Sequence, residues 1–425
     1  MKSNKVIIIL ISILITGSFF FSACEKEKIY PTDYNIVHEL HSLMTEWYLW
    51  KDSISDVNPE NYSNADELMN AMRYSPRDKW SYISTEDEYA QYYEEGTYVG
   101  YGFGHSPDPE GKVRVTFVFE DSDLNNFGIT RSWKINKING ASVDENSAMG
   151  TLLGGEEIGV ENTIEFESPT GTIVSETFSK KLISINTVGN QQVIISGADK
   201  IGYFVFKSFI GPSNDELTET FSDFKAQGVN ELVVDLRYNG GGRMDVVTHM
   251  AGLIIPDNIN GELFLKYEHN MDRSDENSEY LLEQEIESLK LDKVYFITSK
   301  GSASASEAII NGLNPYLDVY VVGDDTYGKP VGMYSFASQV SDLVYVPISF
   351  RLVNSNDFGG YYNGLRADSY VDDDLYNDFG SDELTLKEVL YHIENGTFSS
   401  TKSSYDIYKK PIKEIRNIKD ELGAI

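Results

Sequence analysis

Three turns in the second half of the chain carry the residue types that could do chemistry. One contains the glycines 240–242, one is the serine-rich stretch 299–306, and one ends in Lys329. A serine at the start of a helix lies beside free backbone N–H groups, which can stabilise the oxyanion formed when its hydroxyl attacks a carbonyl carbon. Glycine allows a second backbone N–H to approach the same oxygen. The pattern predicts a nucleophilic serine beside an oxyanion-binding turn.

A serine hydroxyl is a weak nucleophile and needs a base. Histidine is the usual base, but of the six histidines only His249 lies near any of the three turns in sequence. The histidines are His38, His41, His105, His249, His269 and His392. Lys329 is better placed, and a lysine can act as a base when apolar surroundings disfavour its charged form. Taken alone, the serine-rich stretch could be a helix cap, the glycine run a plain turn, and the segment that ends in Lys329 a surface loop.

The elements that would position these turns alternate between strand and helix from residue 187 to residue 395. Strands separated by helices indicate right-handed crossovers and a largely parallel sheet, whose carboxyl edge is where open α/β sheets place their active sites. Strands are predicted at 201–206, 231–236, 293–298 and 318–322, and helices at 215–227, 245–255 and 304–313. All three turns are therefore expected at one edge of this sheet.

The first half of the chain has a different character. Residues 34–96 are predicted to be helical, because apolar residues recur at three- and four-residue steps and Asn64 precedes an apolar run as a helix cap would. Residues 97–186 contain short β-rich runs and are predicted to form a small domain made mainly of strands. Residues 396–425 form a tail without an evident function. The fold class predicted is therefore multidomain α+β.

The N-terminus carries a secretory signal. Lys2 and Lys5 precede the apolar run 6–15, and small residues then lead to Cys24. Residues 1–23 resemble a bacterial lipoprotein signal peptide, which implies that Cys24 is lipidated, that 24–33 form a tether, and that the protein is an exported lipoprotein of the cell envelope. The outer membrane, with a periplasmic or surface face, is the expected location. An uncleaved anchor helix is the alternative, although the apolar run is short for a bilayer span.

Composition excludes several other classes of protein. The 425 residues carry a net charge of −32, which repels phosphate backbones and makes nucleic acid an unsuitable partner. The single cysteine excludes a thiol protease and a disulfide framework. No metal and no cofactor is expected, because the chain has no His-Glu-x-x-His motif and the acidic run 372–374 lacks the spacing of a calcium loop.

Taken in order, the motifs resemble those of the S41 family of serine peptidases, the carboxyl-terminal processing proteases. Residues 235–242 match the family's Asp-Leu-Arg-x-Asn-x-Gly-Gly segment, 304–307 its Ser-Ala-Ser-Glu segment and 326–329 its Thr-aromatic-Gly-Lys segment. The separation of 25 residues between Ser304 and Lys329 is the family's own spacing and selects Ser304 from its serine neighbours.

The resemblance implies a Ser/Lys endopeptidase that cleaves polypeptides. Ser304 would be the nucleophile and Lys329 the general base, with an oxyanion hole made by backbone groups of Gly241, Gly242 and Ala305. It also implies a ClpP/crotonase-like core within the catalytic domain at 187–395.

Residues 97–186 are similar to the PDZ domain of these proteases. Gly100, Tyr101, Gly102 and Phe103 occupy the position of the loop that receives a peptide's C-terminal carboxylate. The resemblance implies substrates with a free C-terminus or partly unfolded segments. A PDZ-like domain that has lost its binding function is the alternative.

Two features depart from the family. Met333 stands where many members have a glutamine that supports the lysine, and methionine cannot orient an amine by a strong hydrogen bond. A catalytically weak or inactive peptide-binding lipoprotein on the same fold therefore stays an alternative. A carbohydrate-binding lipoprotein is a weaker one, because most of the aromatic residues fall where core packing is expected. The aromatic segments at 47–50 and 78–82 resemble the N-terminal region of lipoprotein members, without indicating a role. No oligomeric state is predicted.

Overall fold

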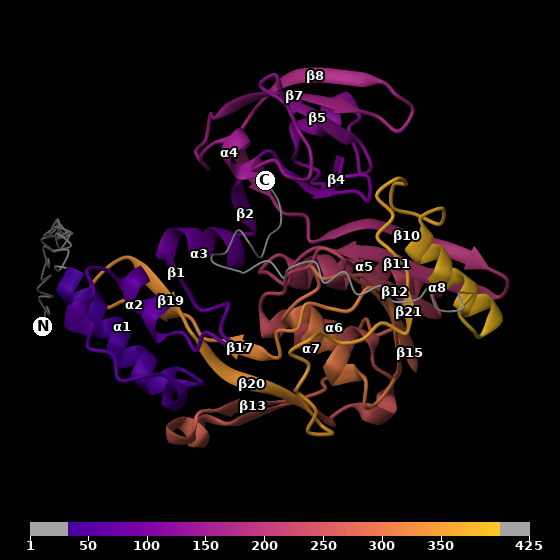
Figure 1. Ribbon diagram of the computed structural model, residues 1–425. Helices are drawn as coiled ribbons and strands as arrows, with labels where there is room; N and C mark the ends of the chain where they lie inside the picture. The colour runs from indigo at the N-terminus through magenta and orange to yellow at the C-terminus, as the bar shows by residue number, and fades with distance from the viewer. Residues whose placement is uncertain (1–32, 400–425) are drawn as a thin grey trace, which may run out of the picture.

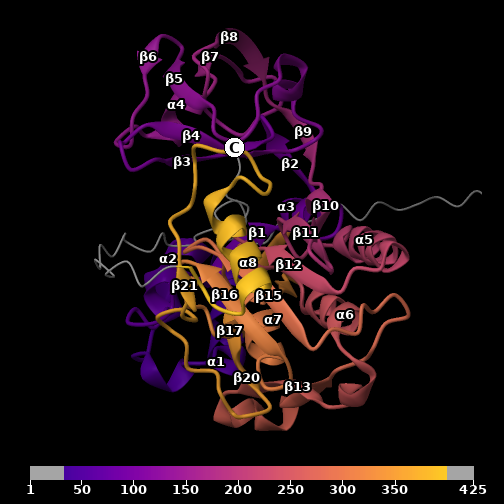
Figure 2. The same cartoon turned by 90° about the vertical axis from the view of Figure 1, so that its right-hand side faces the viewer.

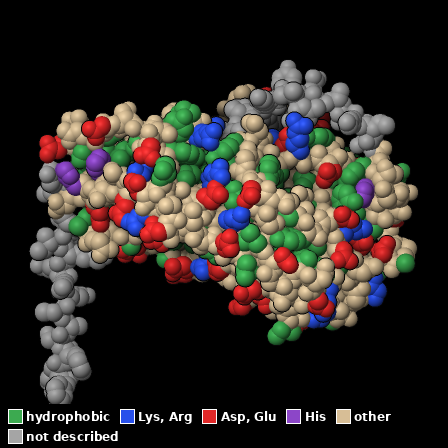
Figure 3. All heavy atoms as spheres, turned by 90° about the horizontal axis from the view of Figure 1, so that it is seen from below, with side chains coloured by type: hydrophobic (Ala, Val, Ile, Leu, Met, Phe, Trp, Pro, Cys, Tyr) green, Lys and Arg blue, Asp and Glu red, His purple; other side chains and the backbone are tan. Residues whose placement is uncertain are grey.

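A computed structural model describes residues 33–399. Figure 1 shows a β-rich unit at the top, two N-terminal helices at one side, and a sheet flanked by helices at the other. On the face presented in Figure 3, acidic and basic side chains are interspersed. No helix within residues 33–399 combines the length and the apolar character that crossing a membrane requires. Residues 1–23, Cys24 and most of the expected tether lie outside the described residues.

A six-stranded, mostly parallel sheet, called the main sheet below, leads into all three turns. Its strand order is β10-β11-β12-β15-β16-β21; β10 and β11 form an antiparallel hairpin, and every later neighbour is parallel. The strands are β10 (Val188–Ser196), β11 (Asp199–Phe206), β12 (Glu231–Asp235), β15 (Lys293–Thr298), β16 (Asp318–Gly323) and β21 (Ser369–Tyr370). The glycine turn follows β12, the serine turn follows β15, and the turn that ends in Lys329 follows β16, so all three leave the carboxyl ends of parallel strands as predicted.

Helices cover both faces of this sheet (Figures 1 and 2). Phe204 and Val234 pack on one face against α5, α6 and α7, whereas Tyr203 and Val233 pack on the other against α8. Central strands buried on both faces need continuous apolar runs, which is what 232–234 provides. The helices are α5 (Ser213–Gln227), α6 (Met244–Ile254), α7 (Ala305–Leu313) and α8 (Leu384–Asn395). Every strand and helix predicted between 201 and 322 agrees with the structure to within two residues.

A second, antiparallel sheet extends toward the N-terminal helices. Its order is β14-β13-β20-β17, and a three-stranded sheet of order β1-β19-β18 continues it. The strands are β13 (Leu263–His269), β14 (Ser278–Leu281), β17 (Val331–Met333), β20 (Ile348–Asn354), β1 (Tyr82–Thr85), β18 (Phe336–Ala337) and β19 (Leu343–Val346). Lys329 lies just before β17, so the lysine turn leads from the main sheet into this second one.

The N-terminal unit, residues 33–85, packs on this second sheet. It contains α1 (Asp33–Trp47), α2 (Ala65–Met72) and β1. Asn64 caps α2 as predicted, since its side chain accepts a hydrogen bond from the Glu67 N–H. The helical prediction for 34–96 is wrong at Tyr82–Thr85, which form β1 and pair with β19. The alternation of buried and half-buried residues in β1 is too short to be recognised without its distant partner strand.

The β-rich unit, residues 97–184, is antiparallel, with strand order β3-β4-β5-β7-β8. Strand β3 is therefore an edge strand, and Asn139 and Gly140 turn the β5–β6 hairpin with φ of 51° and 81°, as the Asn-Gly pair predicts. The elements are β2 (Thr97–Gly100), β3 (Phe103–Pro107), β4 (Val113–Val118), β5 (Lys134–Ile138), β6 (Ala141–Ser142), α4 (Met149–Leu153), β7 (Glu161–Glu167), β8 (Ile173–Ser179) and β9 (Lys181–Ser184). Helix α3 (Glu86–Tyr93) and the β2–β9 pair connect this unit to the rest.

Candidate active site

Ser304 occupies the residue immediately before α7 in an unusual backbone conformation. Its φ is 55° and its ψ is −110°, and the residue is half-buried. A non-glycine residue in a sparsely populated region costs about 1–3 kcal/mol and persists only when its surroundings hold it. Such positions cluster at functional sites, and here the conformation sets Ser304 apart from the regular residues of the helix that follows.

The hydroxyls of the two neighbouring serines are engaged in holding the turns together. Ser302 Oγ donates to the Leu236 carbonyl at 2.7 Å, and Ser306 Oγ donates to the Asn239 carbonyl at 2.9 Å. Both residues are fully buried. These bonds fasten the serine turn (299–304) and the start of α7 to the glycine turn (239–242), and they distinguish Ser304 from Ser302 and Ser306.

The glycine turn lies directly against Ser304. A Cβ added to Gly241 would lie 2.8 Å from Ser304 Cβ and 2.9 Å from the Ala305 nitrogen, and the φ of 114° at Gly241 also favours glycine. The Gly241 N–H donates to Asn239 Oδ1 at 2.9 Å. Within residues 33–399, no hydrogen bond to a protein group is found for the N–H of Gly242 or of Ala305. The predicted oxyanion donors are thus brought together, with the N–H of Gly241 already bound to Asn239.

The segment that follows β11 holds the glycine turn in place. Phe209 N–H donates to the Gly241 carbonyl at 3.0 Å, and Arg243 N–H donates to the Phe209 carbonyl at 2.7 Å. Lys207 donates its ammonium to the Tyr238 carbonyl and lies 4.2 Å from the ring centroid of Phe117 in the β-rich unit. Burial lowers the pKa of Lys207 to about 7. The glycine turn is therefore fixed on both of its sides.

Glu307 joins the serine and lysine turns. Its Oε2 accepts the Ser304 N–H at 3.0 Å and the Lys329 N–H at 2.8 Å. Its Oε1 accepts Thr326 Oγ1 at 2.5 Å and the Gly328 N–H at 2.6 Å. The side chain is fully buried; burial raises the pKa of Glu307, and the four donated hydrogen bonds oppose that rise. One carboxylate thus brings Ser304 and Lys329 together.

Glu307 belongs to the 304–307 motif, but the motif does not predict a separate role for it. The signal was present, because a glutamate three residues after a serine that begins a helix is the spacing of a capping box. What the spacing could not show is that the same carboxylate also accepts hydrogen bonds from the lysine turn (326–329).

Lys329 is 2% exposed and lies among apolar residues. Tyr327 and Val331, on either side of it, are buried in the cluster that also contains Trp80 of the N-terminal unit. The Tyr327 N–H donates to the Ser302 carbonyl at 2.9 Å, which ties the lysine turn to the serine turn a second time. Met333, four residues after Lys329, is half-buried and packs against two apolar clusters.

A buried network of charges lies behind the glycine turn. Arg237 is 1% exposed and pairs with Asp235 and Glu383, each at 2.6 Å, and with Asp373 at 2.9 Å. Arg131 of the β-rich unit also pairs with Asp373, at 2.7 Å. Burial alone would raise the pKa of Asp373, but the two arginines hold it below its usual value. The β-rich unit and the turn that follows β12 therefore share one carboxylate.

The predicted carboxylate-binding loop joins β2 to β3. Tyr101 and Phe103 are buried in the core of the β-rich unit, and the Tyr101 hydroxyl donates to the Val160 carbonyl at 3.2 Å. Gly102 has a φ of 83°, and a Cβ there would lie 2.7 Å from Ser122 Cβ. The loop therefore needs glycine at 102, and its backbone leads into the edge strand β3.

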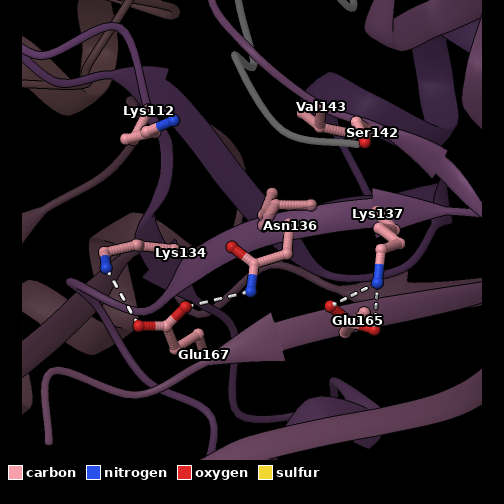
Figure 4. A pocket seen from close by; sticks show the side chains of 9 residues that line it. Lys112, Lys134, Asn136, Lys137, Ser142, Val143, Glu165 and Glu167 are labelled. Carbon is pink, nitrogen blue, oxygen red and sulfur yellow. Dashed lines mark hydrogen bonds and ion pairs between the residues drawn. The ribbon is translucent and has the colours of Figure 1, made fainter. Parts of the chain in front are cut away.

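A separate hollow of about 390 Å³ lies on the β-rich unit (Figure 4). Lys134 pairs with Glu167 at 3.0 Å, and Lys137 pairs with Glu165 at 2.9 Å. The charged side chains that line the hollow largely pair with one another, and the hollow contains none of the residues of the three turns. Within residues 33–399 no group of histidine, cysteine, aspartate or glutamate side chains is arranged to hold a metal ion.

The chain matches two family models. Peptidase family S41 matches over residues 200–359, and the Peptidase S41 N-terminal domain matches over residues 37–82. The first match includes all three turns, and the second covers α1, α2 and the start of β1.

Curated relatives are similar at low identity. The chain is 25% identical over 302 residues to the probable CtpA-like serine protease of Staphylococcus haemolyticus (strain JCSC1435), covering 69% of this chain and 57% of that protein. It is 24% identical over 429 residues to the probable CtpA-like serine protease of Staphylococcus saprophyticus subsp. saprophyticus, covering 93% of this chain and 82% of the relative. The chain thus spans little more than half the length of the first of these relatives.

Solved structures share the fold. A crystal structure from Bacteroides fragilis NCTC 9343, assigned to the S41 proteases, superposes with a TM-score of 0.69 at 23% identity, covering 84% of this chain and 97% of that one. The photosystem II D1 C-terminal processing protease gives a TM-score of 0.54 at 16% identity, covering 85% and 97%. The chain therefore has a mixed α+β multidomain fold similar to that of S41 proteases. In sequence, residues 37–82 and 200–359 are similar to the S41 family models, and the curated relatives are CtpA-like serine proteases.

Proposed function

We propose that the protein is a serine endopeptidase in which Ser304 is the nucleophile and Lys329 the general base. The observation that carries the proposal is the shared acceptor: Oε2 of Glu307 binds the backbone N–H of both residues. The placement of Lys329 supports the second role: it is 2% exposed, and Tyr327 and Val331 beside it belong to a buried apolar cluster.

The proposed reaction is acyl transfer. Ser304 Oγ attacks the substrate's carbonyl carbon while its proton passes to Lys329 Nζ. The oxyanion is stabilised by the Ala305 N–H at the start of α7 and by the adjoining glycine turn, as the contact between Gly241 and the Ala305 nitrogen supports. Lys329 returns the proton to the leaving amine, and water then hydrolyses the acyl-enzyme by the same route.

Substrate selection is proposed to use the β-rich unit as a PDZ-like domain. Strand β3 is at the edge of its sheet, and the loop 100–103 precedes it. An extended C-terminal segment of a polypeptide would add to β3 as a further strand, with its carboxylate at the loop's backbone N–H groups. The proposed location is the cell envelope, with the protein anchored by a lipid on Cys24.

The test uses purified residues 25–425 and casein as an unstructured substrate. Ser304→Ala and Lys329→Ala are each expected to abolish cleavage. Ser274→Ala and Lys225→Ala are the matched controls and should cleave as the wild type does, because both residues are exposed and neither belongs to the three turns. Undiminished cleavage by Ser304→Ala would refute the proposal.

A second candidate is a peptide-binding protein without turnover. Met333, at a position where many family members have glutamine, favours it. This candidate predicts that peptide binding persists in Ser304→Ala and that a fluorophosphonate does not label Ser304 in the wild type. Labelling of the wild type but not of Ser304→Ala supports the peptidase instead.

A further inference from the structure

The N-terminal unit shares an apolar core with the residues flanking the candidate dyad. Leu40 of α1 and Leu68 of α2 are fully buried in one cluster with Ala303, Tyr327 and Val331. Ala303 directly precedes Ser304, whereas Tyr327 and Val331 flank Lys329. The core of the N-terminal unit is therefore not separate from the site, since part of it consists of residues of the serine and lysine turns.

Trp80 links the N-terminal unit directly to the lysine turn. Its indole Nε1–H donates to the Tyr327 hydroxyl at 3.3 Å, and the two ring centroids are 6.3 Å apart. Trp80 is 4% exposed and Tyr327 is 6% exposed, so the contact is excluded from water. Tyr327 lies two residues before Lys329 in the same turn.

Trp80 is itself fixed by a dense set of hydrogen bonds. The Asp78 carboxylate accepts the backbone N–H of Trp80 and of Ser81, each at 2.9 Å, and the Tyr48 hydroxyl at 2.8 Å. Ser81 Oγ donates to Asp78 at 2.6 Å and accepts the Ile348 N–H of β20 at 3.0 Å. These hydrogen bonds fix the backbone at Trp80, the residue whose indole ring contacts Tyr327.

The lysine turn has little freedom to move independently of Tyr327. The Tyr327 N–H is bound to the Ser302 carbonyl, and Gly328 has a φ of 102°. A Cβ at Gly328 would lie 2.6 Å from the Tyr362 carbonyl, so the backbone between Tyr327 and Lys329 is closely packed on its other side. Tyr327 and Lys329 are therefore joined through a single closely packed residue, Gly328.

We propose that Trp80 is a positioning residue of the active site, which acts through Tyr327 to hold Lys329 in place. The proposal rests on the proposed function and gives a role to the N-terminal unit, which supplies one wall of the lysine turn. A misplacement of a catalytic group by about 1 Å can lower the rate about 100-fold, so the support that Trp80 gives to Lys329 should affect kcat.

The test compares Trp80→Phe and Trp80→Ala with the same substitutions at Trp50. Trp50 belongs to the same unit and the same aromatic type, but its ring contacts are Tyr48 and Tyr74. Turnover of a fluorogenic peptide gives kcat and KM, a fluorophosphonate gives the labelling rate of Ser304, and thermal unfolding reports stability.

Trp80→Ala is expected to lower kcat and the labelling rate by at least about tenfold, with KM changed less than about threefold. The Trp50 variants should keep kcat within about twofold of wild type. If Trp80→Ala does not fold, Trp80→Phe and Tyr327→Phe carry the test. Each removes the same hydrogen bond, so the double variant should lose no more than either single one.

Unchanged kcat in folded Trp80→Ala, or an equal loss in Trp50→Ala, overturns the inference. The two proposals fail in different ways. Full activity in Ser304→Ala, or a wild type without serine-dependent turnover, removes both. An inactive Ser304→Ala beside a fully active Trp80→Ala removes only the role of Trp80.

Discussion

Ser304 and Lys329 donate their backbone N–H groups to a single carboxylate oxygen, Oε2 of Glu307, at 3.0 and 2.8 Å. The two residues come from different turns, and neither turn alone fixes their separation. A shared acceptor sets the nitrogens within two hydrogen-bond lengths of each other. The relative placement of the proposed nucleophile and base thus depends on one buried side chain that need not touch the substrate.

Glu307→Gln should therefore impair catalysis more than stability. A glutamine side chain keeps one acceptor oxygen. Its NH₂ group replaces the other oxygen and cannot accept a hydrogen bond, so two of the four groups that donate to Glu307 lose their partner. We expect kcat/KM to fall about 100-fold. Steady-state kinetics measured beside thermal unfolding will separate the two effects.

Glu216→Gln is the matched control for that substitution. Glu216 Oε2 accepts three hydrogen bonds, from the Thr187 N–H, the Thr187 hydroxyl and the Val188 N–H, at 2.7–2.8 Å. Its replacement should lower stability without a comparable loss of turnover. Equal losses of kcat/KM in the two variants would show that Glu307 acts only through stability.

Gly241→Ala should abolish activity. The new methyl group would lie within 3.0 Å of Ser304 Cβ, the Ala305 nitrogen and the Ala303 carbonyl, so the glycine turn must move away from the serine. Gly261→Ala is the control, because Gly261 has a φ of 88° but open space around its Cβ position. Casein cleavage should persist in Gly261→Ala at about its wild-type rate, and retention of activity in Gly241→Ala would argue against an oxyanion role for the turn.

Arg131→Met should destabilise the protein by about 3–5 kcal/mol, the usual loss when one member of a buried charged network is removed. Arg131 is 1% exposed, and its guanidinium bonds to Asp373 and to carbonyl oxygens of two segments. Lys137→Met, in the same β-rich unit, removes a partly exposed pair with Glu165 and should cost less than about 1 kcal/mol. Urea unfolding of the two variants gives both values; similar losses would contradict the assigned importance of Arg131.

Lys207 should give the free energy of unfolding a distinct pH dependence. Burial lowers its pKa from 10.5 to about 7 in the folded chain. Below pH 7 the amine is protonated in both states. Between pH 7 and 10.5 the unfolded chain holds a proton that the folded chain has lost, so this contribution to stability grows as pH rises and diminishes as pH falls toward 7.

Comparison with Lys207→Met isolates that contribution. The difference in unfolding free energy, wild type minus variant, should increase by up to about 1.4 kcal/mol per pH unit across this window. Urea unfolding of both proteins at pH 6.5, 8 and 9.5 measures it. A difference that is constant with pH would show that Lys207 keeps an ordinary affinity for its proton.

Local patterns predicted the elements that carry the turns. The apolar run at 232–234 and the strand β15 were recognisable because central strands buried on both faces need continuous hydrophobic residues. Asn64 marked the start of α2 through its capping role, and Asn139 with Gly140 marked a hairpin. These features depend on neighbouring residues, so the sequence displays them directly.

Contacts between distant segments could not be predicted in this way. Tyr82–Thr85 become a strand only because β19 lies beside them, and their four residues alone carry no clear period. The binding of Asp373 to both Arg131 and Arg237 has no local signal, since Asp373 belongs to a run of three aspartates that are far from both arginines in the sequence. The roles of Ser302 and Ser306 likewise depend on the carbonyls that the fold places beside them.

The hydrogen bond between Trp80 and Tyr327 spans 247 residues of sequence, and that between Ser81 and Ile348 spans 267. Contacts so remote along the chain are slow to form, because the intervening loop must close before they give any stability. Under the proposed function, the lysine turn depends on contacts that only the folded chain brings together, since Trp80 and Tyr327 are far apart in the sequence. Under the same proposal, an unfolded copy of the chain contains both reactive side chains but lacks the contacts that place them, so it would have no protease activity.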